Sequence, residues 1–191
     1  MTKITRRILQ LLLLAGCVAC MPLPRQLYIP DGAGGRGRHT ACSAKDVPES
    51  IEFDIEGVTL DVKVAAVSDG QNYVEVRFAV PRDKVVNLQD DKVTFLWASK
   101  RPKSEGVFEK ISLVDGPIIN IHRPVLQQYM LAVREPMVGH RNFWLATYIT
   151  PPPDSDFSIM LPSISVNGAI VALPEVRFRK GPFALIAPVN C

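Results

Sequence analysis

The sequence lacks the patterns that most helical and membrane-spanning proteins carry. Hardly any segment has the 3.6-residue periodicity of a helix, and the longest apolar run, residues 8–15, is interrupted by Gln10. About 20 apolar residues are needed to cross the hydrocarbon core of a bilayer. These absences exclude a helical bundle and a spanning helix, whereas the 47% hydrophobic content is typical of a chain that buries a core.

Catalytic and metal-binding signatures are also missing. The chain has three histidines and four cysteines. Cys17 and Cys20 form a single C-x-x-C, but the second C-x-x-C and the H-x-x-x-H spacing of common zinc sites are missing. The hydrolase motifs G-x-S-x-G, S-x-x-K and H-E-x-x-H are absent. Isolated candidates for metal binding are His39, Cys42, His122, His140 and the Asp154 and Asp156 pair. We interpret the histidines as surface or loop residues, Cys42 as a disulfide cysteine and the two aspartates as part of a polar turn. We therefore expect no catalytic residues, no metal and no cofactor.

The amino terminus has the layout of an export signal. Lys3, Arg6 and Arg7 precede the short apolar run, and Pro22 follows it. At the end of the run, Leu14-Ala15-Gly16-Cys17 resembles the lipobox of bacterial lipoproteins. That resemblance implies cleavage after residue 16 and lipid on Cys17, with Cys20 as a weaker rival acceptor, and Val18 in place of an aspartate points to the outer membrane. Several acyl chains anchor a protein durably, whereas one chain binds only reversibly.

Export changes the charge and the redox environment of the mature chain. The leader holds three basic residues and no acidic one, so 19 residues of each sign remain. A neutral chain gives no support for a nucleic-acid partner. In an oxidising compartment we predict a disulfide between Cys42 and Cys191, although Cys20 leaves other pairings open.

Residues 17–48 are predicted to be a lipidated, flexible tether. They contain Pro22, Pro24 and Pro30, followed by the glycine-rich stretch 31–38. Gly32, Gly34 and Gly37 formally satisfy G-x-G-x-x-G, but neither the strand before it nor the helix after it that dinucleotide binding requires is indicated.

Residues 49–191 alternate apolar and polar side chains with period two, which predicts strands. Strands are expected at 51–55, 58–64, 73–80, 93–97, 107–114, 117–121, 143–149, 157–161, 164–166, 169–171 and 175–178. Asn167-Gly168 predicts a hairpin with a type I′ turn, and Asp90 with Asp91 predicts a solvated turn. Residues 125–133 are predicted to form a strand, although their apolar residues also fit one face of a helix. The fold prediction is all-β: an antiparallel β-sandwich of immunoglobulin-like type, or alternatively a small β-barrel.

Side chains of possible functional interest have plainer explanations in this fold. If Val176 and Phe178 face the core, Arg177 and Arg179 should point outward and form a solvated cationic edge. The aromatic residues Trp97, Phe143, Trp144 and Tyr148 are interpreted as core or wall residues. Together these features indicate a non-enzymatic envelope lipoprotein on the periplasmic face of a membrane, an interaction or assembly module for an envelope protein. The alternatives are a periplasmic hydrolase and a carrier of lipid or another apolar ligand.

Overall fold

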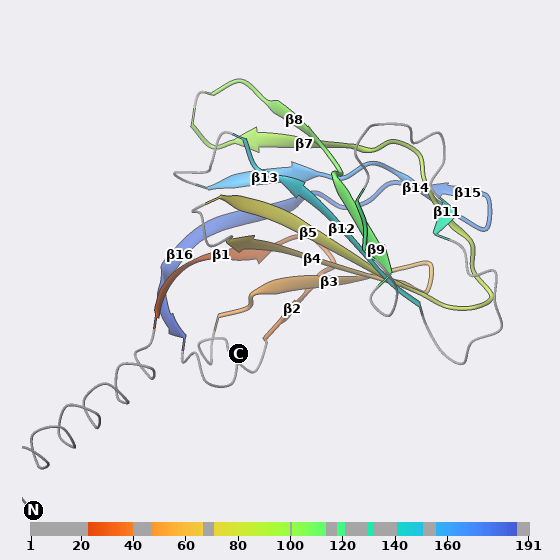
Figure 1. The fold of residues 1–191 in the computed structure, drawn as a ribbon, viewed down its shortest axis with the longest axis horizontal. Coiled ribbons are helices and arrows are strands. Elements are labelled where there is room, and N and C mark those ends of the chain that lie inside the picture. Colours follow the sequence, from red (N-terminus) through yellow and green to blue (C-terminus); the bar gives the residue numbers. More distant parts are fainter. Residues whose placement is uncertain are drawn as a thin grey trace, which may run out of the picture.

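The chain folds into antiparallel sheets stacked as a β-sandwich, which confirms the predicted fold class (Figure 1). The computed structural model describes residues 23–39, 47–66, 71–99, 101–113, 118–120, 130–131, 141–150 and 156–186. Over these residues the sheets do not close into a barrel. No helix that is long and apolar enough to cross a bilayer occurs among them.

The larger layer is a seven-stranded sheet. Its order is β10 (Ile118–Asn120), β9 (Lys110–Leu113), β12 (Arg141–Tyr148), β5 (Asn72–Val80), β4 (Val58–Ala66), β3 (Ser50–Ile55) and β2 (Arg36–Arg38). Neighbouring strands are antiparallel, and β3, β4 and β5 follow one another as a meander. Alternation buries Val58, Leu60 and Val62 on the inner face, as the period-two pattern predicts.

The opposite layer is a five-stranded sheet. It runs in the order β1 (Leu23–Asp31), β16 (Val176–Ile186), β13 (Phe157–Met160), β7 (Lys92–Trp97) and β8 (Ser104–Val107). The predicted strand 107–114 is in fact divided between two sheets, because β8 ends at Val107 and β9 begins at Lys110.

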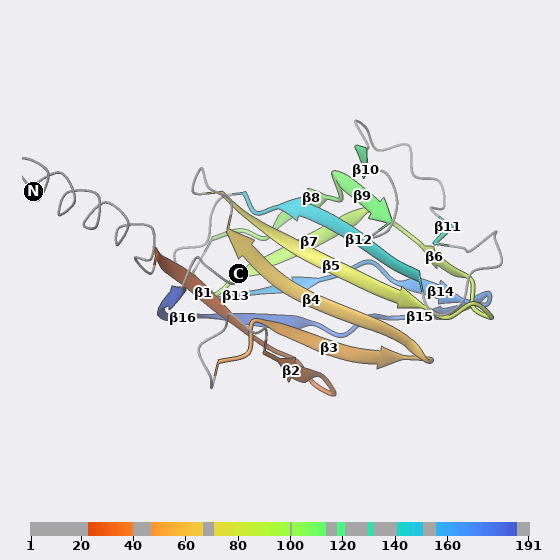
Figure 2. The same cartoon turned by 60° about the horizontal axis from the view of Figure 1, so that its bottom comes forward.

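A small third sheet closes one end of the sandwich (Figure 2). Its order is β11 (Met130–Leu131), β6 (Val86–Leu88), β14 (Ile164–Val166) and β15 (Ala169–Val171). Asn167 and Gly168 both have positive φ, 50° and 88°, which confirms the predicted I′ type of hairpin between β14 and β15. Of the ambiguous segment 125–133, only β11 lies within the described residues.

The core between the two main layers is filled by aromatic and branched side chains. Phe157 stacks on Phe178 with ring centroids 5.3 Å apart, and Tyr28 meets Phe157 edge-on at 5.8 Å. Phe78 and Phe95, from opposite sheets, are fully buried in the same cluster. The described interior is therefore densely packed with side chains.

The predicted tether is wrong over residues 23–38. β1 pairs with β16 from Leu23↔Ile186 to Asp31↔Arg177, and Tyr28 is 6% exposed. The ordered body therefore begins well before residue 49. Pro24 and Pro30 are tolerated because β1 is an edge strand of its sheet, where a missing N–H donor on the outer side costs nothing.

The glycines after β1 serve a tight turn and a close approach. Gly35 N donates to Gly32 O at 3.1 Å, and Gly34 has φ 79°. A Cβ atom on Gly35 would come within 2.5 Å of Ile51 Cδ1 and 2.7 Å of Phe53 Cε1. The glycine-rich stretch is thus a packed β1–β2 turn, and it places Arg36 and Arg38 beside β3.

Candidate functional site

The outer face of the seven-stranded sheet carries charged side chains in cross-strand register. Since Leu60 and Val62 point into the core, Asp61 and Lys63 point outward on β4. Register then places Arg77 of β5 opposite Asp61 and Glu75 opposite Lys63. Opposite charges facing each other across strands stabilise a sheet pair by a fraction of a kcal/mol each, roughly 0.2–1 kcal/mol.

Glu75 is the most buried charged residue of this face. Its side chain is only 4% exposed, and Oε1 lies 3.3 Å from Lys63 Nζ. Arg77 donates from Nε to the same oxygen at 2.6 Å, and its Nη2 lies 2.5 Å away. One buried carboxylate is thus held between two cations that keep access to solvent.

Asp61 forms a second group with the neighbouring strand. Ser50 Oγ donates to Asp61 Oδ2 at 2.8 Å. Burial raises the pKa of Asp61, and the Ser50 hydrogen bond and the charges of Arg38, Arg77 and Lys63 oppose that rise without cancelling it. The ionised carboxylate is therefore less favourable here than in water.

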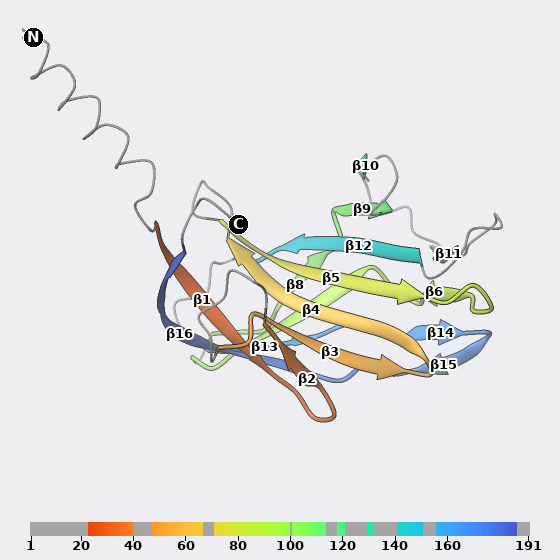
Figure 3. The same ribbon diagram turned by 90° about the horizontal axis from the view of Figure 1, so that it is seen from below.

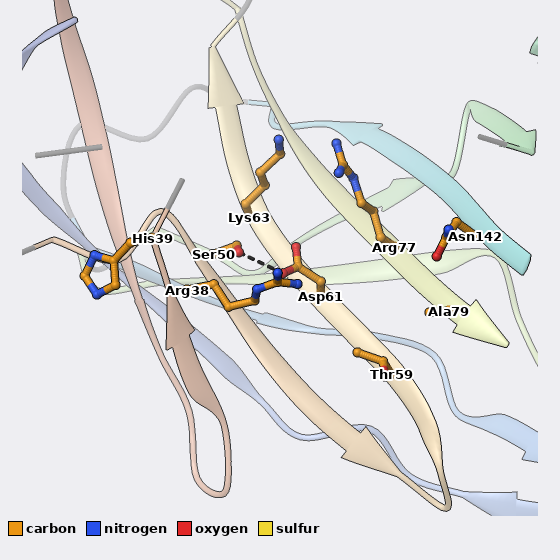
Figure 4. A pocket seen from close by; sticks show the side chains of 9 residues that line it. All are labelled: Arg38, His39, Ser50, Thr59, Asp61, Lys63, Arg77, Ala79 and Asn142. Atoms are coloured by element: carbon orange, nitrogen blue, oxygen red, sulfur yellow. Dashed lines mark hydrogen bonds between the residues drawn. The ribbon is translucent and has the colours of Figure 1, made fainter. Parts of the chain in front are cut away.

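Two arginines of β2 complete the charged face. Arg36 Nη2 lies 3.1 Å from Glu52 Oε1, and Arg38 Nη1 lies 2.9 Å from Glu52 Oε2. Both guanidinium groups are more than half exposed, so each pair contributes little to stability. The pairing neutralises Glu52 and positions Arg38 toward Asp61 (Figure 4).

These strands line an open depression of about 400 Å³. Its lining is formed by Arg38, His39, Ser50, Thr59, Asp61, Lys63, Arg77, Ala79 and Asn142. The Ser50 hydroxyl donates to a carboxylate, and the imidazole of His39 is directed away from it (Figure 4). A serine nucleophile needs a base that accepts its proton and a third group that orients that base. This depression offers paired hydrogen-bonding groups rather than that relay.

Three aromatic side chains lie beside the charged face. Tyr73 meets Trp144 and Tyr148 edge-on, each pair with centroids 6.4 Å apart. Trp144 and Tyr148 are half-buried on the outer face, because Phe143 and Leu145 take the inward positions of β12. Phe143 is thus a core residue, and Trp97 is half-buried and packs against the core. Of the two predicted alternatives, core or wall, Trp144 and Tyr148 take the wall position on the outer side of the sheet.

The other basic group predicted from the sequence is placed as expected. Val176 and Phe178 are fully buried, and Arg177 and Arg179 are exposed on the outer side of β16.

Asp156, one of the candidate residues from the sequence, has a structural contact. The backbone N–H of Lys180 donates to Asp156 Oδ1 at 3.0 Å, so this aspartate fixes the start of β13 against β16.

Asp90 and Asp91 form the predicted turn. Asp90 Oδ1 accepts from the backbone N–H groups of Asp91, at 2.7 Å, and Lys92, at 3.2 Å. Burial alone would raise the pKa of Asp90, and the hydrogen bonds from Asp91 and Lys92 outweigh it, so that the pKa is lowered. The carboxylate is a turn cap here.

Several residues singled out in the sequence lie outside the described residues. They are Cys17, Cys20, Cys42, Cys191, His122, His140 and Asp154. The lipidation at Cys17 and the disulfide between Cys42 and Cys191 therefore stay predictions. The described ranges hold no group of three His, Cys, Asp or Glu side chains suited to a metal ion.

Sequence reasoning missed the grouping on the outer face. The alternating Asp61, Lys63, Glu75 and Arg77 were visible as the polar side of two strands, but their pairing depends on strand register.

No family model, no curated protein and no solved structure matches this chain.

Proposed function

We propose that this protein is a membrane-anchored envelope lipoprotein whose sandwich acts as a non-enzymatic interaction or assembly module. The observation that carries the proposal is Cys17, preceded by Leu14-Ala15-Gly16 and a charged, then apolar, leader. A well-packed sandwich behind such an anchor suits a rigid body that presents a surface. The proposed location is the periplasmic face of the outer membrane.

The anchor is tested by growing cells with labelled fatty acid. Wild-type protein is expected to incorporate label and to stay with washed membranes, whereas Cys17→Ala is expected to lose both properties. Cys20→Ala is the matched control, since it changes the neighbouring cysteine of the same segment and should retain label. A Cys17→Ala protein that still takes up label overturns the anchor.

The interaction role is supported by an edge strand with an exposed apolar residue. β15 is the outer strand of the four-stranded sheet, and Ile170 on it is 72% exposed. An edge strand offers unpaired backbone groups to a partner strand, with exposed side chains adding specificity. A photocrosslinking residue at Ile170 should capture one defined envelope protein in intact cells. The same residue at Arg36, on the edge strand β2, should not.

The two rival functions gain no specific observation from the described residues. A hydrolase would need a relay of serine, base and a third group that orients the base. In the described residues Ser50 donates to Asp61, and the imidazole of His39 is directed away from Ser50, so this relay is not assembled there (Figure 4). A carrier of an apolar ligand would need an apolar cavity between the sheets, whereas Phe78, Phe95 and Phe157 fill that space. Both observations favour the interaction module.

A further inference from the structure

The distance between the proposed lipid anchor and the folded body is short. Leu23, the first residue of β1, follows Cys17 by six residues. A fully extended chain spans at most about 3.6 Å per residue, so this connection reaches about 22 Å at most. A flexible chain of that length has a mean span of only about 13 Å.

The attachment point lies at one end of the sandwich. In all three views the start of β1 lies beside the end of β16, and the end of β4 and the start of β5 lie at the same end of the sandwich (Figures 1, 2 and 3). Within the sheets, Leu23 pairs with Ile186 and Ala66 with Asn72. We name this the anchor end.

The hairpins β3–β4 and β14–β15 lie at the opposite end, which we name the hairpin end (Figure 3). The β4 strand has nine residues. At about 3.3 Å per residue it separates the two ends by about 30 Å. The connection to Cys17 is shorter than the body, so a body attached by it cannot turn over freely.

Side chains suited to a bilayer surface lie toward the anchor end. Tyr73 and Tyr148 pair near the start of β5 and the end of β12. The end of β7 and the start of β8 lie at the same end in Figure 1, and their connection carries the exposed cations Arg101 and Lys103. Tyrosine rings favour the interface between headgroups and hydrocarbon. Basic side chains are attracted to anionic lipid by about 1 kcal/mol each.

We propose that the anchor end lies against the lipid headgroups and that the hairpin end faces away from the membrane. The occupant of the anchor end is thus the bilayer. Exposed Ile170 and its edge strand are presented to a partner at the hairpin end. This inference rests on the proposed lipidation of Cys17.

The orientation is measured on lipidated protein in vesicles of phosphatidylethanolamine and phosphatidylglycerol. A fluorescent noncanonical residue is placed at exposed Gln71 in the anchor end or at exposed Ile170 in the hairpin end. Energy transfer to an acceptor on the lipid headgroups should be more efficient from position 71 than from position 170, because about 30 Å separates the two ends.

A linker variant is the matched test. Inserting about thirty Gly and Ser residues before Leu23 raises the mean span of the connection to about 33 Å, beyond the length of the body, so the two transfer efficiencies should become nearly equal. If the two efficiencies stay as unequal after the insertion as before it, the side chains of the anchor end alone hold the orientation. That result overturns the role that we assign to the short connection.

Vesicle flotation separates the two levels of the proposal. Protein that floats with the vesicles but transfers energy equally from positions 71 and 170, or better from 170, overturns the orientation and leaves the anchor intact. Protein that does not float and carries no lipid overturns the proposed anchor, and the orientation with it.

Discussion

Replacing Tyr28 by Ala tests whether residues 23–31 belong to the folded body. Tyr28 is 6% exposed and packs edge-on against Phe157. Removing a buried aromatic ring typically costs about 3–5 kcal/mol through lost burial and the cavity left behind. Because β1 is an edge strand that can relax, we expect the free energy of unfolding to fall by about 3 kcal/mol. A residue in a flexible tether would change it by less than about 0.5 kcal/mol.

The assay is urea unfolding of a soluble form that begins at residue 18, followed by tryptophan fluorescence. With a slope of about 2 kcal/mol per molar urea, the midpoint should fall by about 1.5 M. Asp31→Ala is the matched control, since it lies in the same strand with an exposed side chain. It removes only the charge opposite Arg177, so the midpoint should fall by no more than about 0.5 M. Equal midpoints for Tyr28→Ala and the unsubstituted protein would refute the assignment of β1 to the core.

Three further substitutions test the outer face and the hairpin. Asp61→Asn keeps an amide oxygen that accepts from Ser50 but removes the titrating carboxyl group. The folded state keeps the Asp61 proton to higher pH than the unfolded state, so the stability of the wild type should fall as the pH rises above about 3.8. Urea titrations at several pH values should show that fall for the wild type and not for the variant. Glu75→Gln leaves Lys63 and Arg77 without their counter-charge, and calorimetry should show that the free energy of unfolding falls by about 1–2 kcal/mol. This is less than the 3–5 kcal/mol of a fully buried pair, because both cations reach solvent. An unchanged free energy of unfolding would contradict the pairing. Asn167→Gly keeps the positive φ but removes the side-chain oxygen that accepts from Val85 N at 2.8 Å. Chemical denaturation should show that the free energy of unfolding falls by about 1 kcal/mol. An unchanged value would show that the turn needs only its backbone geometry.

Local pattern was sufficient for most strands. The alternating apolar residues of β3, β4 and β5 predicted their inward faces, because a strand with one buried side must place an apolar residue at every second position. Asn167-Gly168 predicted its hairpin for a similarly local reason: the turn requires positive φ at two consecutive positions. These features depend on neighbours in the sequence.

The β1 strand escaped the same reasoning for two physical reasons. Its prolines and the glycines after it are typical of a loop, yet an edge strand tolerates prolines and a tight turn needs glycines. A register shift between Gln26 and Tyr28 also breaks the alternation, so Leu27 and Tyr28 are both buried. Only pairing with β16, about 150 residues away in the chain, makes this segment a strand.

By itself the sequence determined the all-β class, because periodicity acts over a few neighbouring residues. From charge order it also predicted an export signal, with Cys17 as the proposed lipid acceptor. Tertiary structure decided which charges meet on the outer face and how close to Cys17 the folded body begins. Both depend on register between strands that are distant in the sequence, and a shift of one residue would have turned Glu75 and Asp61 toward the core.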